Sequence, residues 1–267
     1  MMQIDFTGKN FLVTGGAGVG VGAGICEAIS DCGGTLLLND LDAVKTKTAA
    51  KKYPNAHAVV GDISNAKDVE QIFEEIKNEY GLVHGLVNNA GIGLHKNAHL
   101  ADESEFDNLY NIDVKGVWLM ARTFVRQLME ANEVGHIVNI SSVHARETTA
   151  KYALYASAKA AVEGLTRGMS IELGEFGVRC NAVAPGYVDS EQSRDAVASW
   201  TDEPKAWIQG QKNDYQSLRH MISARDCGNA VVFLLSHMAN SITGQTLTVD
   251  AGFTNLLYAN SFIPNTQ

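Results

Sequence analysis

The chain of 267 residues has little of several features that define other classes of protein. None of its four cysteines lies in a C-x-x-C pair or a His/Cys cluster, which argues against a zinc site or a redox disulfide. Its formal net charge of −9 is unfavourable for binding nucleic acid through a basic surface. We therefore expect no metal site and no nucleic-acid partner, and interpret the cysteines as buried residues in a reducing compartment.

Long apolar segments are also missing. No run approaches the roughly 20 apolar residues that a membrane-spanning helix needs. The stretch Met1–Thr7 contains Asp5 and lacks the basic region and apolar stretch of a secretory signal. Only four prolines interrupt the chain, so few linkers are expected. These absences predict a cytoplasmic protein without a membrane partner, in which residues 1–267 form one domain.

What the chain does contain is a regular alternation of apolar, β-branched runs with longer segments of helical periodicity. Strands are expected at Asn10–Thr14, Thr35–Asn39, Ala56–Val60, His84–Asn88, His136–Ile140, Val178–Val183 and Gln245–Val249. Helices are expected at Ile25–Cys32, Ala43–Tyr53, Ala66–Tyr80, Glu103–Ala131, Tyr152–Phe176 and Ala224–Ser236. This alternation predicts an α/β fold in which right-handed crossovers place helices on both faces of a doubly wound parallel sheet.

One stretch departs from this alternation. Residues 187–221 are polar and irregular, and they include Trp200, Pro204 and Trp207. An insertion of this length in a compact domain is typically functional, so we expect a substrate lid at about 188–221. The alternative is a surface excursion that has no part in binding.

The first strand runs into a glycine-rich turn, which has six glycines between residues 15 and 24. Glycine disfavours helix formation, so we expect the following helix to begin only near Ile25. Such a turn lets the backbone approach a ligand closely, and the free N–H groups at the start of a helix suit a pyrophosphate. The position of the turn therefore predicts a dinucleotide site; the alternative is a flexible loop.

Two acidic residues follow the next two strands. Asp40 suits the adenosine ribose hydroxyls and would repel a 2′-phosphate, and no Arg or Lys lies beside it to reverse that effect. NAD is therefore favoured over NADP as the cofactor. Asp62 is a candidate partner for the adenine amino group. Each acid also has a plainer interpretation, as a turn residue for Asp40 and as a helix cap for Asp62, a role that Ser64 can also take.

A phenol and an ammonium lie four residues apart, at Tyr155 and Lys159, and so share one face of a predicted helix. The ammonium and a positive nicotinamide ring would favour phenolate, so that Tyr155 can take a proton from an alcohol or return one to a carbonyl. Lys159 can also hold the nicotinamide ribose. Ser142, 13 residues before Tyr155 and just past a strand, can hydrogen-bond the substrate oxygen. The alternative for Ser142 is a turn or capping serine.

In its ordered motifs the chain resembles the short-chain dehydrogenase/reductase family over nearly its full length. The matching motifs are the turn after Thr14, Asp62, Asn88-Asn89-Ala90-Gly91, Ile140-Ser141-Ser142, Tyr155-x-x-x-Lys159, Asn181-Ala-Val-Ala-Pro185-Gly186 and Gly244-Gln-Thr-Leu-Thr-Val-Asp250-Ala-Gly252. The resemblance implies a Rossmann-type sheet of seven strands, catalysis by Ser142, Tyr155 and Lys159, and a homotetramer or dimer.

The resemblance also guides the choice of binding residues. Contacts with the cofactor are expected from Gly15, Gly20, Gly22, Asp40, Asp62, Ile63, Asn89, Gly91, Tyr155, Lys159, Pro185, Val188 and Ser190. Contacts with the substrate are expected from Ser142, Tyr155, His95, His144 and Tyr187. His144 is a candidate donor to a second substrate oxygen, its alternative being an ordinary core or surface histidine. Because polar side chains outnumber apolar ones here, we expect a polyol, a sugar or a hydroxy-acid-like substrate.

Two positions depart from the family pattern. Aligning Gly20 and Gly22 with the last two family glycines needs one extra residue, so either the turn bulges or Gly18 takes the role of the first glycine. Further on, Asp113 stands three residues before Gly116, where the family has an Asn that helps to hold a water behind the lysine. We expect Asp113 to keep the backbone role of that Asn and to add a charge near Lys159. The alternative is a simple pairing partner in its helix, and either way we expect catalysis to survive.

Together these observations predict an NAD-dependent alcohol or polyol dehydrogenase, which moves a hydride between NAD and a secondary alcohol or ketone. Two other functions remain open. An NADP-dependent carbonyl reductase is disfavoured by Asp40. A catalytically silent NAD-binding regulatory protein is disfavoured by the presence of Ser142, Tyr155 and Lys159.

Overall fold

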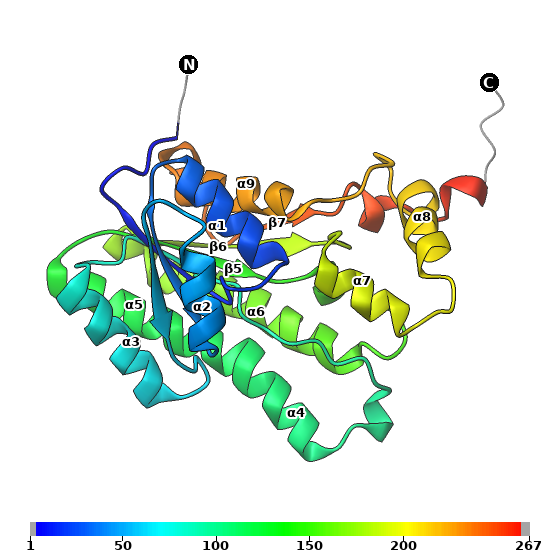
Figure 1. Ribbon diagram of the computed structural model, residues 1–267, viewed down its shortest axis with the longest axis horizontal. Helices are drawn as coiled ribbons and strands as arrows, with labels where there is room; N and C mark the ends of the chain where they lie inside the picture. The colour runs from blue at the N-terminus through cyan, green and yellow to red at the C-terminus, as the bar shows by residue number, and fades with distance from the viewer. Residues whose placement is uncertain (1–3, 263–267) are drawn as a thin grey trace.

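The computed structural model describes residues 4–262, so Met1–Gln3, part of the stretch considered above for a signal sequence, lie outside it. Seven parallel strands form one sheet in the order β3-β2-β1-β4-β5-β6-β7 (Figure 1). The strands are β1 (Asn10–Thr14), β2 (Thr35–Asp40), β3 (Ala56–Val60), β4 (Gly85–Asn88), β5 (His136–Ile140), β6 (Arg179–Pro185) and β7 (Thr246–Val249). The order reverses between β1 and β4, which is where open sheets of this kind bind ligands.

Helices cover both faces of the sheet, so the predicted doubly wound α/β fold is confirmed. One face packs against α1 (Val21–Asp31), α2 (Ala43–Ala50) and α9 (Ala224–Leu235). The other packs against α3 (Ala66–Glu79), α5 (Val117–Ala131) and α6 (Ala153–Glu172). Successive side chains of a strand point to opposite faces, and accordingly Leu36 and Leu38 of β2 join the first core while Leu37 joins the second. Across residues 4–262, every helix is either too short or too polar to span a bilayer.

The start of α1 differs from its prediction. The helix begins at Val21 rather than near Ile25, and it includes Gly22 and Gly24. The reason is tertiary packing: a side chain on Gly24 would collide with the backbone of Ala224, where α1 crosses α9. The close approach of the two helices therefore outweighs the low helix propensity of glycine.

The helix expected over Glu103–Ala131 is instead three segments. It consists of α4 (Glu103–Tyr110), a π-helical turn η2 (Asn111–Gly116) and α5. π-Helical turns are rare overall, and those that occur are often found at functional sites. In this one Asp113 is fully buried, which makes it a charged group inside the protein.

The stretch expected to be irregular, residues 187–221 between β6 and α9, is also more regular than expected. It contains two helices, α7 (Glu191–Ala198) and α8 (Pro204–Asp214), which Figure 1 shows beside each other at one end of the molecule. Ser190 caps α7, and Pro204 occupies the first turn of α8, where proline is favoured. The apolar periodicity of α8 is weak in the sequence because this helix buries none of its residues. The remaining predicted elements match the structure to within a few residues.

Candidate active site

The glycine-rich turn connects β1 to α1 at the reversal of the strand order. Gly15 adopts a left-handed conformation with φ of 65°, which glycine adopts without strain. Asn89 Nδ2 donates to the carbonyl oxygens of Thr14 and Gly15, at 2.9 and 3.2 Å. Thr14 Oγ1 in turn accepts from the N–H groups of Asn89 and Ala90, both at 3.0 Å. These bonds tie the end of β1 to the end of β4 and fix the shape of the turn.

The start of α1 fits a pyrophosphate. Gly20 is its N-cap, and within the described residues no side chain caps the helix, so its first N–H groups are available to an anion. A Cβ on Gly22 would lie 2.5 Å from the carbonyl oxygen of Gly15, which shows how closely the two backbones approach. Gly18 and Val19 are exposed at the tip of the turn. Gly15, Gly20 and Gly22, which we call the base of the turn, are less exposed.

The two acidic residues lie at the carboxyl ends of β2 and β3. Asp40 ends β2, while α2 is capped by Asp42, so the carboxylate of Asp40 is not used as a helix cap. Asp62 Oδ1 accepts from both the backbone N–H and the hydroxyl of Ser64, at 2.8 Å each. The N-cap of α3 is Asn65, so the capping role considered for Asp62 and Ser64 is wrong. Instead, Asp62 stabilises the turn after β3.

The catalytic candidates come from the end of β5 and the first two turns of α6. Lys159 Nζ lies 5.5 Å from the centre of the Tyr155 ring and donates to the carbonyl oxygen of Ile140 at 3.4 Å. Ser142 caps a short 3-10 turn, η3 (Val143–Ala145), and its hydroxyl accepts from the N–H of His144 at 3.2 Å. The ring of His144 is 5.7 Å from that of Tyr155. The structure thus places Ser142, Tyr155 and Lys159 in one neighbourhood.

Asp113 contacts Lys159 directly. Its Oδ2 lies 2.9 Å from Lys159 Nζ, and its Oδ1 accepts from the N–H of Ile92 at 2.8 Å. Burial lowers the pKa of Lys159, but the charges of Tyr155 and Asp113 oppose this, and the pKa of Lys159 ends above its usual value. Asp113 is therefore an ion-pair partner across two elements and not a pairing partner within its own helix.

Other predicted cofactor residues surround these groups. Gly91 lies against the pair of Asp113 and Lys159, and buried Ile63 packs against Gly116. At and after the end of β6, the predicted cofactor contacts Pro185, Val188 and Ser190 are all buried. The Ser190 hydroxyl also caps α7, which gives it a local structural role in addition to the predicted one.

An aromatic wall lies beside Tyr155; we define it as His95, His144, Tyr152 and Trp200. Tyr152 stacks on His144 at 4.4 Å between ring centres, and its ring is 5.0 Å from His95 and 5.9 Å from Tyr155. Trp200, between α7 and α8, is 5.3 Å from His95. The wall therefore connects Tyr155 to the segment expected to be a lid.

The predicted Tyr187 lies farther along, where its ring is 5.2 Å from Trp207, which in turn is 5.8 Å from Trp200. Tyr152 was not among the predicted site residues. Its spacing of three residues before Tyr155, on the same helix face, is the signal that could have identified it.

The titratable groups of the wall are uncharged near neutral pH. Burial lowers the pKa of His144, whose Nδ1 is 3.0 Å from the hydroxyl of Thr148. Burial, with a smaller effect of Lys151, also lowers the pKa of His95. Burial raises the pKa of Tyr152. Next to Tyr155, the wall therefore offers hydrogen-bonding groups and ring faces without formal charge.

Comparisons with known proteins agree with this geometry. The family model described as Enoyl-(Acyl carrier protein) reductase matches residues 16–254. An L-xylulose reductase of Caenorhabditis elegans is 34% identical over 257 residues, which cover 94% of this chain and 98% of that protein. A 2-(S)-hydroxypropyl-CoM dehydrogenase of Xanthobacter autotrophicus is 31% identical over 246 residues, which cover 91% of this chain and 95% of that protein.

Among solved structures, a gluconate 5-dehydrogenase of Burkholderia cenocepacia, in complex with NADP and tartrate, aligns with a TM-score of 0.86 at 25% identity. The alignment covers 96% of this chain and 98% of the other. The chain therefore belongs to the short-chain dehydrogenase/reductase family, and it is an oxidoreductase that transfers a hydride between a nicotinamide cofactor and an alcohol or carbonyl carbon.

Proposed function

We propose that the protein is an NAD-dependent dehydrogenase that interconverts a secondary alcohol and a ketone on a neutral polyol or sugar. The observation that carries this proposal is the cluster of Tyr155, Lys159 and Ser142 beside an uncharged aromatic wall. The chain acts as one domain, with residues 188–221 as the lid over the substrate. Its four cysteines are free, which supports a location in the reducing cytoplasm.

Each catalytic group has one role in this reaction. Ser142 donates a hydrogen bond to the substrate oxygen and orients it toward Tyr155. The Tyr155 phenolate takes the hydroxyl proton during oxidation, and the neutral phenol returns it during reduction. Lys159 holds the nicotinamide ribose and favours the phenolate. When bound, the nicotinamide ring accepts the hydride from the alcohol carbon or returns it to the carbonyl carbon.

The choice of NAD rests on charge at the adenosine end of the site. Asp40 would repel a 2′-phosphate, and the turn from Gly15 to Gly24 contains no Lys or Arg that could bind one. The base of the turn and the uncapped start of α1 would hold the pyrophosphate. Asp62 and Asn89, at the ends of β3 and β4, flank the same crevice. This proposal distinguishes the protein from its Burkholderia relative, whose structure contains NADP.

The choice of a neutral substrate rests on two arginines, Arg146 just after η3 and Arg194 on α7. Arg146 Nε lies 3.2 Å from the buried carboxylate of Glu163. Arg194 makes two hydrogen bonds to Asp189, at 2.7 and 3.0 Å. Both arginines are thus already paired with a carboxylate, which favours a polyol or ketose over a hydroxy acid. Among the relatives, the L-xylulose reductase is named for a substrate of this neutral class.

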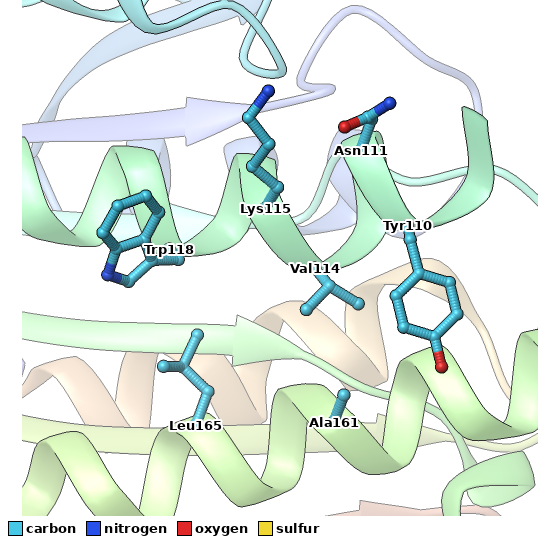
Figure 2. A pocket seen from close by; sticks show the side chains of 7 residues that line it. All are labelled: Tyr110, Asn111, Val114, Lys115, Trp118, Ala161 and Leu165. Atoms are coloured by element: carbon cyan, nitrogen blue, oxygen red, sulfur yellow. The ribbon is translucent and has the colours of Figure 1, made fainter. Parts of the chain in front are cut away.

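We also propose that the protein is a homo-oligomer, a dimer or tetramer, built through the exposed face of α4, α5 and α6. This face presents Phe106, Trp118 and Ile171 to solvent, with 39%, 41% and 82% of their surface exposed. Between the helices runs a groove lined by Tyr110, Asn111, Val114, Lys115, Trp118, Ala161 and Leu165 (Figure 2). A second copy that presents the same face would cover these apolar groups. Trp118→Glu should therefore reduce the mass measured by analytical ultracentrifugation, and an unchanged mass would argue against this face.

The central experiment compares Tyr155→Phe with the unmodified enzyme on a panel of polyols, ketoses, hydroxy acids and simple secondary alcohols, followed by NADH absorbance. We expect neutral polyols or ketoses to react best, and Tyr155→Phe to lower kcat by about a thousandfold or more with NAD affinity unchanged. Tyr152→Phe is the matched control, because it removes a nearby phenol hydroxyl while keeping the stacked ring. Turnover that survives Tyr155→Phe would contradict the proposal, and NAD binding without turnover of any substrate would support the silent alternative.

A further inference from the structure

We propose that Asp113 is a positioning residue that neutralises Lys159 through a buried ion pair and thereby moves hydride transfer to a higher pH range than an asparagine there would give. The proposal rests on the roles proposed above for Tyr155 and Lys159. Its consequence is that the neutral phenol, which donates the proton in carbonyl reduction, persists to higher pH.

The ion pair is held by three elements of the fold. The π-helical turn η2 buries the Asp113 side chain, whose Oδ1 is fixed by the N–H of Ile92 in the loop after β4. Its Oδ2 lies 2.9 Å from Lys159 Nζ on α6. The loop contributes a second constraint at Gly91, where a Cβ would lie 2.9 Å from Asp113 Oδ2 and 3.2 Å from Lys159 Nζ. A side chain at position 91 would thus push into the pair, so the glycine leaves room for it.

Other charged groups near Tyr155 do not duplicate this effect. Just before α6, Tyr152 is a phenol whose pKa is raised further by burial, so it carries no charge that could replace that of Asp113. On η3, His144 is a neutral imidazole, because burial lowers its pKa. Glu163, one turn after Lys159 on α6, is paired with Arg146 and lies 3.4 Å from the hydroxyl of Ser141. Asp113 is the carboxylate that touches the lysine amine.

The effect on Tyr155 follows from the balance of charges. A cation beside the phenol favours phenolate, and a carboxylate in contact with that cation cancels much of its field. An asparagine would leave the positive charge of Lys159 uncompensated. With Asp113, phenolate therefore forms at higher pH, so alcohol oxidation needs more alkaline conditions. Ketone reduction needs the neutral phenol as proton donor and is sustained to higher pH.

The test is Asp113→Asn, measured as the pH dependence of kcat/KM in both directions. In the pH profile of kcat/KM, oxidation falls on the acid side and reduction falls on the alkaline side; we call these falls the acid limb and the alkaline limb. We expect both limbs to move to lower pH by about one unit. A second measurement needs no cofactor: the titration of Tyr155 in the free protein, followed by the ultraviolet difference spectrum against Tyr155→Phe. It should move in the same direction. Asp107→Asn, on the exposed surface of α4, changes the net charge equally and should move neither quantity.

Unchanged or upward-shifted limbs in a folded Asp113→Asn enzyme would overturn the proposal. Folding is checked by the melting temperature and by NAD affinity. If that variant does not fold, Asp113→Ser gives a smaller neutral group, and the same downward movement is required of it. Activity retained in Tyr155→Phe would instead overturn the proposed function, so the two failures are distinguishable.

Discussion

The proposed cofactor half and the proposed catalytic half of the site are built from different parts of the chain. Around β1 and α1, the cofactor half is made of backbone, and Gly15 and Gly22 approach each other so closely that a methyl group would not fit. Around β5 and α6, the catalytic half is made of polar side chains, and Ser142, Lys159 and Asp113 each have a partner. We therefore expect added side-chain atoms to weaken cofactor binding in the first half. In the second half, we expect the removal of polar atoms to slow catalysis.

The largest effect is expected from removing an atom in the catalytic half. Ser142→Ala deletes the hydroxyl that we propose donates to the substrate oxygen, and it should lower kcat by about 100- to 1,000-fold. NAD affinity, measured by fluorescence titration, should stay within about twofold because the cofactor half is untouched. The two parts of this result separate a catalytic serine from a turn serine.

The matched control is the neighbouring Ser141→Ala. Ser141 Oγ donates to the carbonyl oxygen of Lys159 at 3.3 Å, so its loss should reduce stability by about 1 kcal/mol and kcat only slightly. If both variants lost kcat equally, the specific role of Ser142 would be contradicted.

The cofactor half should respond to a single added methyl group. In Gly22→Ala the new Cβ would lie 2.5 Å from the Gly15 carbonyl oxygen and 2.7 Å from Asn89 Nδ2. We expect the dissociation constant for NAD to rise by about 30-fold, equivalent to about 2 kcal/mol, with kcat at saturating NAD nearly unchanged. Alanine is a better helix former than glycine, so helix propensity alone would favour the variant. Weaker NAD binding can therefore be attributed to the close approach of the two backbone segments.

Gly18→Ala is the control for that experiment. Gly18 is exposed at the tip of the turn, where the nearest atom to a Cβ is the Gly15 carbonyl oxygen at 3.6 Å. This variant should bind NAD normally. Equal weakening in both variants would mean that the whole turn, and not its base, meets the cofactor.

The clustering of the proposed catalytic residues was easier to predict than the shape of the glycine-rich turn, for a physical reason. The chemistry of a side chain follows directly from its residue type. Ser142, Tyr155 and Lys159 could therefore be proposed as a catalytic group from their identity and spacing. The early start of α1 could not, because it depends on the contact of Gly24 with a helix about 200 residues later. The sheet was predictable because short apolar runs, such as Phe11–Val13 and Leu36–Leu38, alternate with longer segments of helical periodicity.

Two other features escaped prediction because they leave little trace in the pattern of residues. A π-helical turn has no distinct apolar period, so the burial of Asp113 appeared only in the structure. The helices α7 and α8 pack few side chains inside the protein, and a helix without an apolar face gives a weak signal. Sequence-based prediction thus failed in two situations. In one, contacts with distant residues determine the local structure; in the other, the element has too few buried residues to produce an apolar pattern.

Substitution of Asp40 should have an effect of intermediate size on cofactor preference. Asp40 contributes a charged side chain to the cofactor half, which is otherwise formed mainly by backbone. Asp40→Ala should relax the preference for NAD over NADP by about tenfold, because the repulsion of a 2′-phosphate is removed. The measurement is the ratio of kcat/KM for the two cofactors. Asp42→Asn removes the same charge nearby while keeping a good cap for α2, so it should leave that ratio unchanged. An unchanged ratio in Asp40→Ala would contradict the choice of NAD.

The smallest effect is expected in the proposed lid, which belongs to neither half. Trp200 is 38% exposed, and its ring contacts His95 and Tyr152 at 5.3 and 6.3 Å between centres. Contacts of this kind contribute about 0.5–1.5 kcal/mol, so Trp200→Ala should raise the KM of the substrate by about 2- to 10-fold, with kcat and NAD affinity retained. Trp200→Phe keeps a ring and should recover part of the loss. Leu218→Ala removes an exposed apolar side chain from the same segment and should change nothing. An unchanged KM in Trp200→Ala would mean that the segment is a surface excursion, whereas a loss of kcat would make the aromatic wall part of the catalytic half.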